Sequence, residues 1–253
     1  MRALAIAAHP DDIEFMMAGT LILLKKAGVD THIMNISNGC YGSEIYSKEE
    51  TARIRTLEAQ TAAKLIGAEW YPSITDDANI FYTAEQLRKV AAVIRKVQPD
   101  ILLTLSRYDY MEDHEYTSRL ASSAAFNRCL PAYITDPPYP SFNKPIALYH
   151  SLPHSLMDMQ RTPIIPEFLI DISSVIDRKS DMLSCHKSQK EWLDATQGMG
   201  SYVEMMKQTA KEVAQKWTEF EYAEGWRRHN HVGYGPADFS PLQDILRSHY
   251  QTL

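Results

Sequence analysis

The sequence predicts an α/β fold, a three-layer Rossmann-like arrangement in which helices cover both faces of a mostly parallel β-sheet. Short, continuous apolar runs indicate strands that are buried on both faces, as in a parallel sheet. Segments of helical periodicity alternate with these runs, which is the pattern of repeated β-α units. With 253 residues, 45% of them hydrophobic, the chain can bury a core of ordinary size. We therefore expect residues 1–253 to form one domain, with an elaborated C-terminal part from about residue 131.

The first β-α unit contains a polar turn. Residues 4–8 are an apolar run, and His9-Pro10-Asp11-Asp12 follows it directly. Pro10 fixes its own φ and disfavours helix at His9, so we expect the helix to begin at Asp12 and to end near Gly28. An imidazole and two carboxylates thus stand at the carboxyl end of a buried strand, where open α/β sheets bind ligands.

Two interpretations of this turn are open from the residues alone. His9 and Asp12 could share one metal ion while Asp11 stays unligated beside it, which is the division of roles that a hydrolytic metal site needs. Alternatively, the two aspartates cap the helix and His9 is an ordinary turn residue.

The alternation of strands and helices continues up to a second polar cluster. Ser47 and Thr83 each begin a capping box, which marks the start of a helix. The expected elements are strands at 31–37, 70–73 and 101–105, and helices that run from the two capping boxes to Gly67 and Pro99. The second polar cluster, residues 106–117, follows the last of these strands and contains His114, which begins the next helix.

The C-terminal half is predicted in less detail. Residues 131–145 are rich in proline and tyrosine and predict a long surface connection. We expect strands at 146–151 and 168–172 and a helix at 202–216. His229 and His231 could bind a metal ion, but no carboxylate or cysteine stands nearby in the sequence, and a polar loop is the preferred interpretation.

Several segments resemble one protein family. His9-Pro10-Asp11-Asp12, followed by Ala18-Gly19-Thr20-Leu21, is similar to the opening motif of the LmbE-like/PIG-L family of zinc-dependent N-deacetylases. The resemblance extends to a second block with Arg55 and Glu58, to a helix with His186-x-Ser188-Gln189, and to a terminal strand at 222–226. Without it, Arg55 and Glu58 would be an i,i+3 surface pair, and His186 would lie on a solvated helix face.

The resemblance implies a site and an activity. His9, Asp12 and His114 would bind one zinc ion per chain, and three protein ligands plus water are typical of a catalytic zinc. Asp11 would be the general base. Arg55 would reach the substrate pocket, and Asp77 or its neighbour Asp76, with Asp77 preferred, would lie at the pocket mouth. The implied reaction removes an N-acetyl or other N-acyl group, most plainly from an N-acetylglucosamine-type sugar or conjugate.

The chain departs from the family pattern at Met111. Many members have a histidine here that assists the tetrahedral intermediate, and a thioether cannot donate a hydrogen bond. Tyr110 could supply a donor, and so could His231 if the C-terminal segment folds back over the sheet edge; His231 is preferred, because an imidazole both donates and titrates near neutral pH. If neither residue supplies the donor, the enzyme relies on zinc and Asp11 alone for catalysis, or its activity has been lost.

Two other functions compete with this one. A zinc amidase of a non-sugar substrate would use the same ligands. A non-catalytic Rossmann-like binding module is disfavoured, because the ligand set and Asp11 are both present and no Gly-x-Gly-x-x-Gly turn follows the first strand.

Composition restricts the partners. The formal net charge of −6 offers no basic surface for nucleic acid or for an anionic membrane, so a small-molecule substrate is expected, and a homo-oligomer stays open. No signal peptide or membrane span is expected. Three cysteines without metal-binding spacing suit a reducing compartment, and a cytoplasmic location is expected.

Overall fold

The computed structural model describes residues 1–189, residue 192 and residues 202–253. Within these residues the strands form one eight-stranded sheet in the order β3-β2-β1-β4-β5-β7-β6-β8. The strands are β1 (Arg2–Ala7), β2 (Asp30–Asn35), β3 (Glu69–Tyr71), β4 (Ile101–Thr104), β5 (Ala147–Ser151), β6 (Phe168–Asp171), β7 (Ala223–Arg228) and β8 (Tyr250–Thr252). The predicted α/β class is confirmed.

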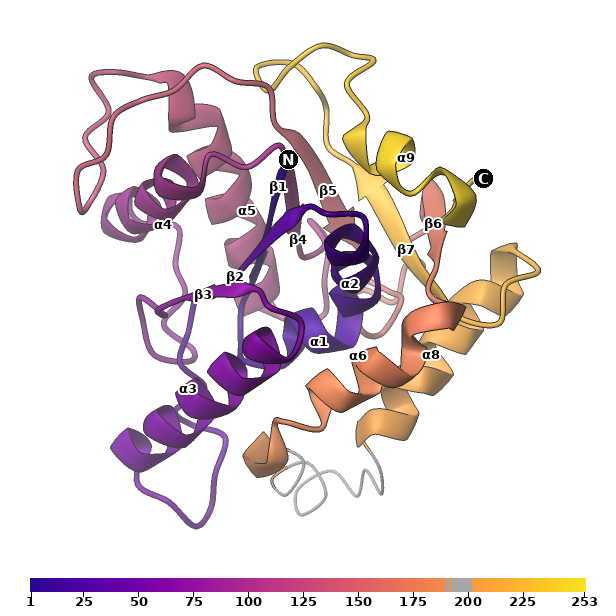
Figure 1. The fold of residues 1–253 in the computed structure, drawn as a ribbon. Helices are drawn as coiled ribbons and strands as arrows, with labels where there is room; N and C mark the ends of the chain where they lie inside the picture. Colours follow the sequence, from indigo (N-terminus) through magenta and orange to yellow (C-terminus); the bar gives the residue numbers. More distant parts are fainter. Residues whose placement is uncertain (190–191, 193–201) are drawn as a thin grey trace.

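Helices cover both faces of the sheet and make it the middle of three layers. Helices α4 (Ala84–Val97) and α5 (Glu112–Phe126) lie on one face. The other face carries α1 (Asp12–Met16), α2 (Ala18–Lys26), α6 (Ile176–Leu183) and α8 (Tyr202–Trp217), with α3 (Lys48–Leu65) against α6 and β3 (Figure 1). A short helix, α9 (Pro241–Ile245), precedes the last strand.

The sheet has a parallel half and an antiparallel half. Strands β3, β2, β1, β4 and β5 all run parallel to their neighbours, as the continuous apolar runs predict. Strand β1 lies at the centre of this half, and its residues Leu4, Ala5 and Ile6 are completely buried. From β5 onward the pairs β5-β7, β7-β6 and β6-β8 are antiparallel. The parallel half therefore places the loops after β1, β2 and β4 at one edge, called here the carboxyl edge.

The helix starts follow the predicted capping boxes. Ser47 Oγ accepts a hydrogen bond from Glu50 N, and Thr83 Oγ1 accepts one from Gln86 N. Each bond satisfies a backbone donor that the first helical turn leaves free. Among the described residues, no helix combines the length and the apolar character needed to cross a membrane.

Two features differ from the prediction. The first helix is divided at Met17, whose φ of −132° is not helical, so α1 and α2 are separate. Strand β8 was not predicted, because three residues with one aromatic side chain give no apolar run. The long connection at 131–145 is confirmed, since these residues contain neither helix nor strand and are mostly exposed.

Candidate metal centre

Three predicted ligands meet at the carboxyl edge. His9 follows β1, Asp12 begins α1, and His114 lies in the first turn of α5, after β4. Strands β1 and β4 are parallel neighbours, with Ile6 opposite Thr104, so the loops that follow them lie side by side. One potential ligand atom from each of His9, Asp12 and His114 lies within 4.8 Å of the other two. We call these residues the trio.

Aspartates outside the trio orient both histidines. His9 Nε2 lies 3.0 Å from Asp113 Oδ2, and His114 Nδ1 lies 3.1 Å from Asp109 Oδ1. The other ring nitrogens, His9 Nδ1 and His114 Nε2, each lie 3.5 Å from a carboxylate oxygen of Asp12. A histidine that binds a metal usually donates its second N–H to a carboxylate in this way. Asp109 and Asp113 were not predicted from the sequence, although both belong to the polar cluster that contains His114.

The trio is strongly coupled electrostatically. Burial opposes charge on all three groups, yet hydrogen bonds from His9 to Asp113 and Asp12 raise the pKa of His9 to about 9. The charge of His114 holds the pKa of Asp12 well below its usual value despite the same burial. Asp12 is thus negatively charged and stabilised by a positive neighbour, and a divalent metal ion would fill the same role. Two imidazole nitrogens and one carboxylate oxygen are a donor set that suits zinc.

Asp11 lies beside the trio without joining it. Its φ is 112°, in the left-handed region that non-glycine residues rarely adopt, and its side chain makes no capping hydrogen bond to α1 among the described residues. Capping therefore does not explain Asp11. Asp11 Oδ2 instead accepts a hydrogen bond from the Tyr202 hydroxyl at 3.2 Å and lies 3.5 Å from Arg55 Nη2. Burial raises the pKa of Asp11 to about 6, although the charge of Arg55 acts in the opposite direction.

A cavity of about 330 Å³ opens over these groups. Arg55, Asp77, Tyr110 and Met111, all singled out from the sequence, line it together with the trio and Asp11. The other lining residues are Tyr41, Gly42, His154, Gln189, Trp192 and Tyr202.

Arg55 and Asp77 both hold the loop after β2 against the site. The Arg55 guanidinium donates to Pro10 O and Gly39 O. Gly39, with φ of 74°, has no side chain, and a Cβ there would lie 2.5 Å from Arg55 Nε. Asp77 accepts hydrogen bonds from Ser37 Oγ and Gly39 N, both at 2.7 Å. The alternative of a surface pair between Arg55 and Glu58 is wrong, because Arg55 is buried.

The helix motif around His186 also turns inward. Glu58 accepts hydrogen bonds from the backbone and hydroxyl of Ser188, and Gln189 lines the cavity. His186 is buried, with Nε2 3.5 Å from Glu14 Oε2. The interpretation of a solvated helix face is therefore wrong at these positions.

Comparisons with known proteins identify the family of the chain. The sequence model of the family described as "PIG-L: GlcNAc-PI de-N-acetylase" matches residues 4–125. The chain belongs to the PIG-L/LmbE-like family. The match includes the whole trio and Asp11.

The relatives of this PIG-L/LmbE-like chain differ in activity. Diacetylchitobiose deacetylase of Thermococcus kodakarensis is 27% identical over 196 residues, 74% of this chain and 70% of the relative. The 4-oxalmesaconate hydratase of Pseudomonas putida is 26% identical over 209 residues, 74% of each chain. The structure of N,N'-diacetylchitobiose deacetylase from Pyrococcus horikoshii, complexed with its inhibitor, has a TM-score of 0.75 at 24% identity and covers 95% of this chain and 88% of that one. The fold is shared, and both deacetylases and a hydratase are relatives.

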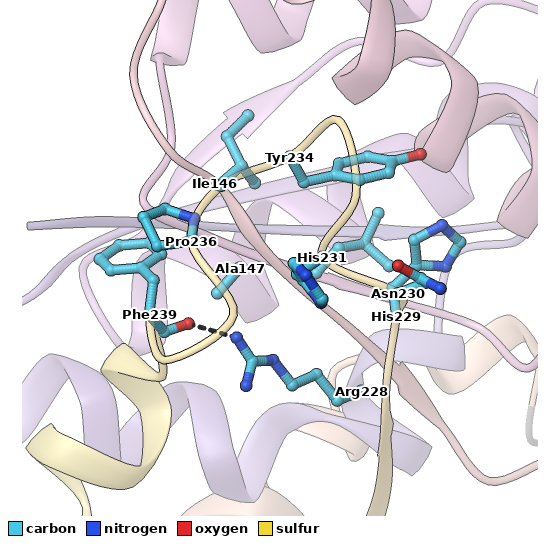
Figure 2. A pocket seen from close by; sticks show the side chains of 11 residues that line it. Ile146, Ala147, Arg228, His229, Asn230, His231, Tyr234, Pro236 and Phe239 are labelled. Atoms are coloured by element: carbon cyan, nitrogen blue, oxygen red, sulfur yellow. Dashed lines mark hydrogen bonds between the residues drawn. The ribbon is translucent and has the colours of Figure 1, made fainter.

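His231 does not reach the site of this family member. Strand β7 runs antiparallel to β5, so it ends beside the start of β5, at the edge opposite the trio. There His231 lines a small cavity of about 10 Å³ with Ile146 and Ala147 (Figure 2). The expectation that the C-terminal segment folds back over the carboxyl edge is wrong, because the resemblance indicated a terminal strand at 222–226 but not that it runs antiparallel to β5.

The structure brings another histidine into the cavity. His154 follows β5, which is parallel to β4 and ends at the carboxyl edge. His154 was not predicted from the sequence, because it lies outside the family motifs. Its position two residues after Leu152, just beyond a predicted parallel strand, is the signal that could have identified it.

Proposed function

We propose that this protein is a zinc-dependent N-deacetylase that removes an acetyl group from the amide nitrogen of an N-acetylated sugar or sugar conjugate. The observation that carries the proposal is the position of Asp11, a buried carboxylate directly beside the trio but outside it. A hydrolytic site needs both a set of metal ligands and a separate base.

The residues divide the chemistry as follows. His9, Asp12 and His114 would hold one zinc ion per chain, which when bound lowers the pKa of water toward about 7 and polarises a carbonyl group. Asp11 takes a proton from the attacking water and returns it to the amine nitrogen as the C–N bond breaks. The products are acetate and a free amine. Tyr202 and Arg55 hold the Asp11 carboxylate in place.

The proposed substrate class is supported by the cavity and by the deacetylase relatives. About 330 Å³ is the size of a small-molecule site, and Tyr41, Tyr110 and Trp192 supply aromatic faces at its wall. Two of the similar proteins are deacetylases of diacetylchitobiose, an N-acetylated sugar.

A hydratase is the second candidate, because the hydratase relative is as similar to the chain as the deacetylase. The same water and the same Asp11 could add H and OH across an activated carbon–carbon double bond. An amidase of a non-sugar substrate would use the chemistry of the first proposal.

One screen separates these functions. Zinc-loaded enzyme is incubated with N-acetylated sugars, simple N-acyl amines and unsaturated di- and tricarboxylic acids. An amine-reactive fluorophore measures amine release, and ultraviolet absorbance measures loss of conjugation. We expect amine release, fastest from an N-acetylated sugar. Loss of conjugation without amine release would support the hydratase, and ligand binding without either signal would support a binding module.

A further inference from the structure

Among the described residues that line the cavity, His154 is a polar side chain to which neither the motifs nor the proposed chemistry gives a role. Its Nε2 atom is buried and has no hydrogen-bond partner in the described part of the chain. Buried polar atoms are nearly always paired, because an unpaired one forfeits its hydrogen bonds to water. Since His154 faces a cavity, a group of the bound substrate would explain the unpaired nitrogen.

Packing holds the His154 ring in place. Its centroid lies 3.5 Å from that of Phe15 on α1, and Phe15 in turn packs against Tyr202, which bonds to Asp11. The same short helix thus carries the ligand Asp12 and the support of His154. A ring fixed in this way is a preorganised donor, which stabilises developing charge without rearranging during the reaction.

The protonation state of His154 suits a neutral donor. Burial lowers the pKa of His154 to about 3, although the charge of Asp12 acts in the opposite direction. Around neutral pH the ring therefore carries one N–H and no charge. A neutral imidazole can donate a hydrogen bond to an oxygen that becomes negative.

The other candidate donor is placed differently. Tyr110 is 42% exposed and packs edge-on against His114, so it lies at the mouth of the cavity. Met111 also lines the cavity and can donate nothing.

We propose that His154 is a catalytic residue that donates a hydrogen bond to the substrate oxygen on which negative charge develops. It supplies the donor that Met111 lacks. This inference rests on the proposed deacetylase function and adds a residue to it. A test must therefore also work if the reaction is of another kind.

The first measurement needs no substrate. Methylphosphonate, a tetrahedral anion with the methyl group of acetate, is titrated calorimetrically into the zinc-loaded parent and into His154→Phe and His154→Gln. Phe keeps the ring against Phe15 without a donor, and the Gln amide restores one. We expect His154→Phe to bind at least about tenfold more weakly, as for loss of a hydrogen bond to a charged group, and His154→Gln to recover part of the affinity.

The second measurement is turnover of the best substrate from the screen. We expect kcat of His154→Phe to fall about 10²- to 10³-fold, with a much smaller change in KM, because the donor acts mainly in the transition state. Zinc content should be unchanged. The melting temperature should not fall, because an unpaired nitrogen stabilises nothing. His231→Phe, a histidine at the opposite edge, is the matched control and should behave like the parent.

The outcomes separate the two proposals. If no substrate releases an amine but methylphosphonate binding still depends on His154, the deacetylase proposal fails and the donor is supported. If the parent and His154→Phe give the same titration, the donor is overturned whatever the screen shows. Equal kcat in an active parent and His154→Phe would also overturn it.

Discussion

At the scale of single residues, each histidine of the trio forms a hydrogen bond between one ring nitrogen and an aspartate outside the trio: His9 with Asp113, and His114 with Asp109. These pairs determine which nitrogen of each ring faces Asp12, and they increase the basicity of that nitrogen. Asp109 is completely buried and close to the His114 ring, so it cannot be replaced by solvent in this role.

Metal content tests the trio and its supports. We expect about one zinc per chain in the parent and loss of most of it in His9→Ala, Asp12→Ala and His114→Ala. Asp109→Asn should retain the site but bind zinc about 10- to 100-fold more weakly, as is typical for partners of metal-bound histidines. Competition with a zinc chelator measures both effects. Full zinc occupancy in all three alanine variants would exclude the trio.

A second substitution separates the base from the ligands. Asp11→Asn keeps the size of the side chain and removes its charge. We expect zinc content to persist while kcat falls about 10²- to 10⁴-fold, the usual contribution of a general base. Tyr202→Phe removes only the hydrogen bond to Asp11 and should have a smaller effect. An Asp11→Asn enzyme with parental kcat would contradict the assigned role.

Much of this site was predictable, because two polar clusters each follow an apolar strand, and parallel strands place such clusters at one edge. The orienting aspartates and His154 were not, since their roles depend on which side chains meet across the edge. The motif His9-Pro10-Asp11-Asp12 also allowed a helix cap, and only the φ of Asp11 and the contacts of its carboxylate separate the two interpretations.

At the scale of elements, Glu224 of β7 explains why the first helix is divided. Its carboxylate accepts hydrogen bonds from Gly19 N and Thr20 N, both at 2.8 Å, and thereby binds the free amide groups that begin α2. Lys179 of α6 pairs with the same carboxylate at 2.6 Å. A Cβ at Gly19 would lie 2.5 Å from the Ile172 side chain, so glycine permits this close approach.

The predicted helix from Asp12 to Gly28 shows that a local sequence pattern carries no information about contacts with distant residues. Apolar periodicity runs through Met17 without interruption, and the break depends on a carboxylate from a distant strand. Local patterns predicted where most elements lie, and they failed where a remote residue decides the backbone conformation.

Unfolding experiments test the buried pair. Glu224→Gln leaves Lys179 buried without its counter-charge, and we expect it to lower the free energy of unfolding by about 3–5 kcal/mol. The double variant Glu224→Gln with Lys179→Met should lose much less than the sum of the two single losses, because the charges are removed together. Urea titration monitored by circular dichroism measures each value. Additive losses would show that the two charges do not depend on each other.

At the scale of the whole molecule, β5 joins the parallel and antiparallel halves, and His150 lies at this junction. Its Nδ1 lies 2.9 Å from Leu105 O, and its Nε2 lies 2.9 Å from His229 Nδ1. Burial lowers the pKa of His150 to about 3, with Arg107 and Arg227 disfavouring the charged ring as well. The junction therefore holds a neutral imidazole.

This histidine should make the fold sensitive to acid. The pKa of His150 is depressed on folding, so below about pH 6.5 the unfolded chain binds a proton that the folded chain does not. Above that pH the stabilising contribution of the neutral His150 ring is fully present. As the pH decreases toward 3, this contribution to the free energy of unfolding falls by up to about 1.4 kcal/mol per pH unit. When the pH is lowered from 7.5 to 5.5, we expect the free energy of unfolding of His150→Gln to decrease by about 1 kcal/mol less than that of the parent, as measured by urea titration. Comparing each protein with itself at the two pH values cancels the direct effect of the substitution, and an unchanged difference would contradict the prediction.

The bond between Glu224 and Gly19 also bears on how the protein is made. The two residues are 205 positions apart, and translation proceeds from the N-terminus. A nascent chain exposes His9, Asp12 and later His114 long before β7 leaves the ribosome. Until then α2 lacks its carboxylate partner, and β5 lacks the strand that continues the sheet. The metal-binding residues are thus synthesised before the strand that supports them, so a mutation at Glu224 can impair a helix start encoded 205 positions earlier.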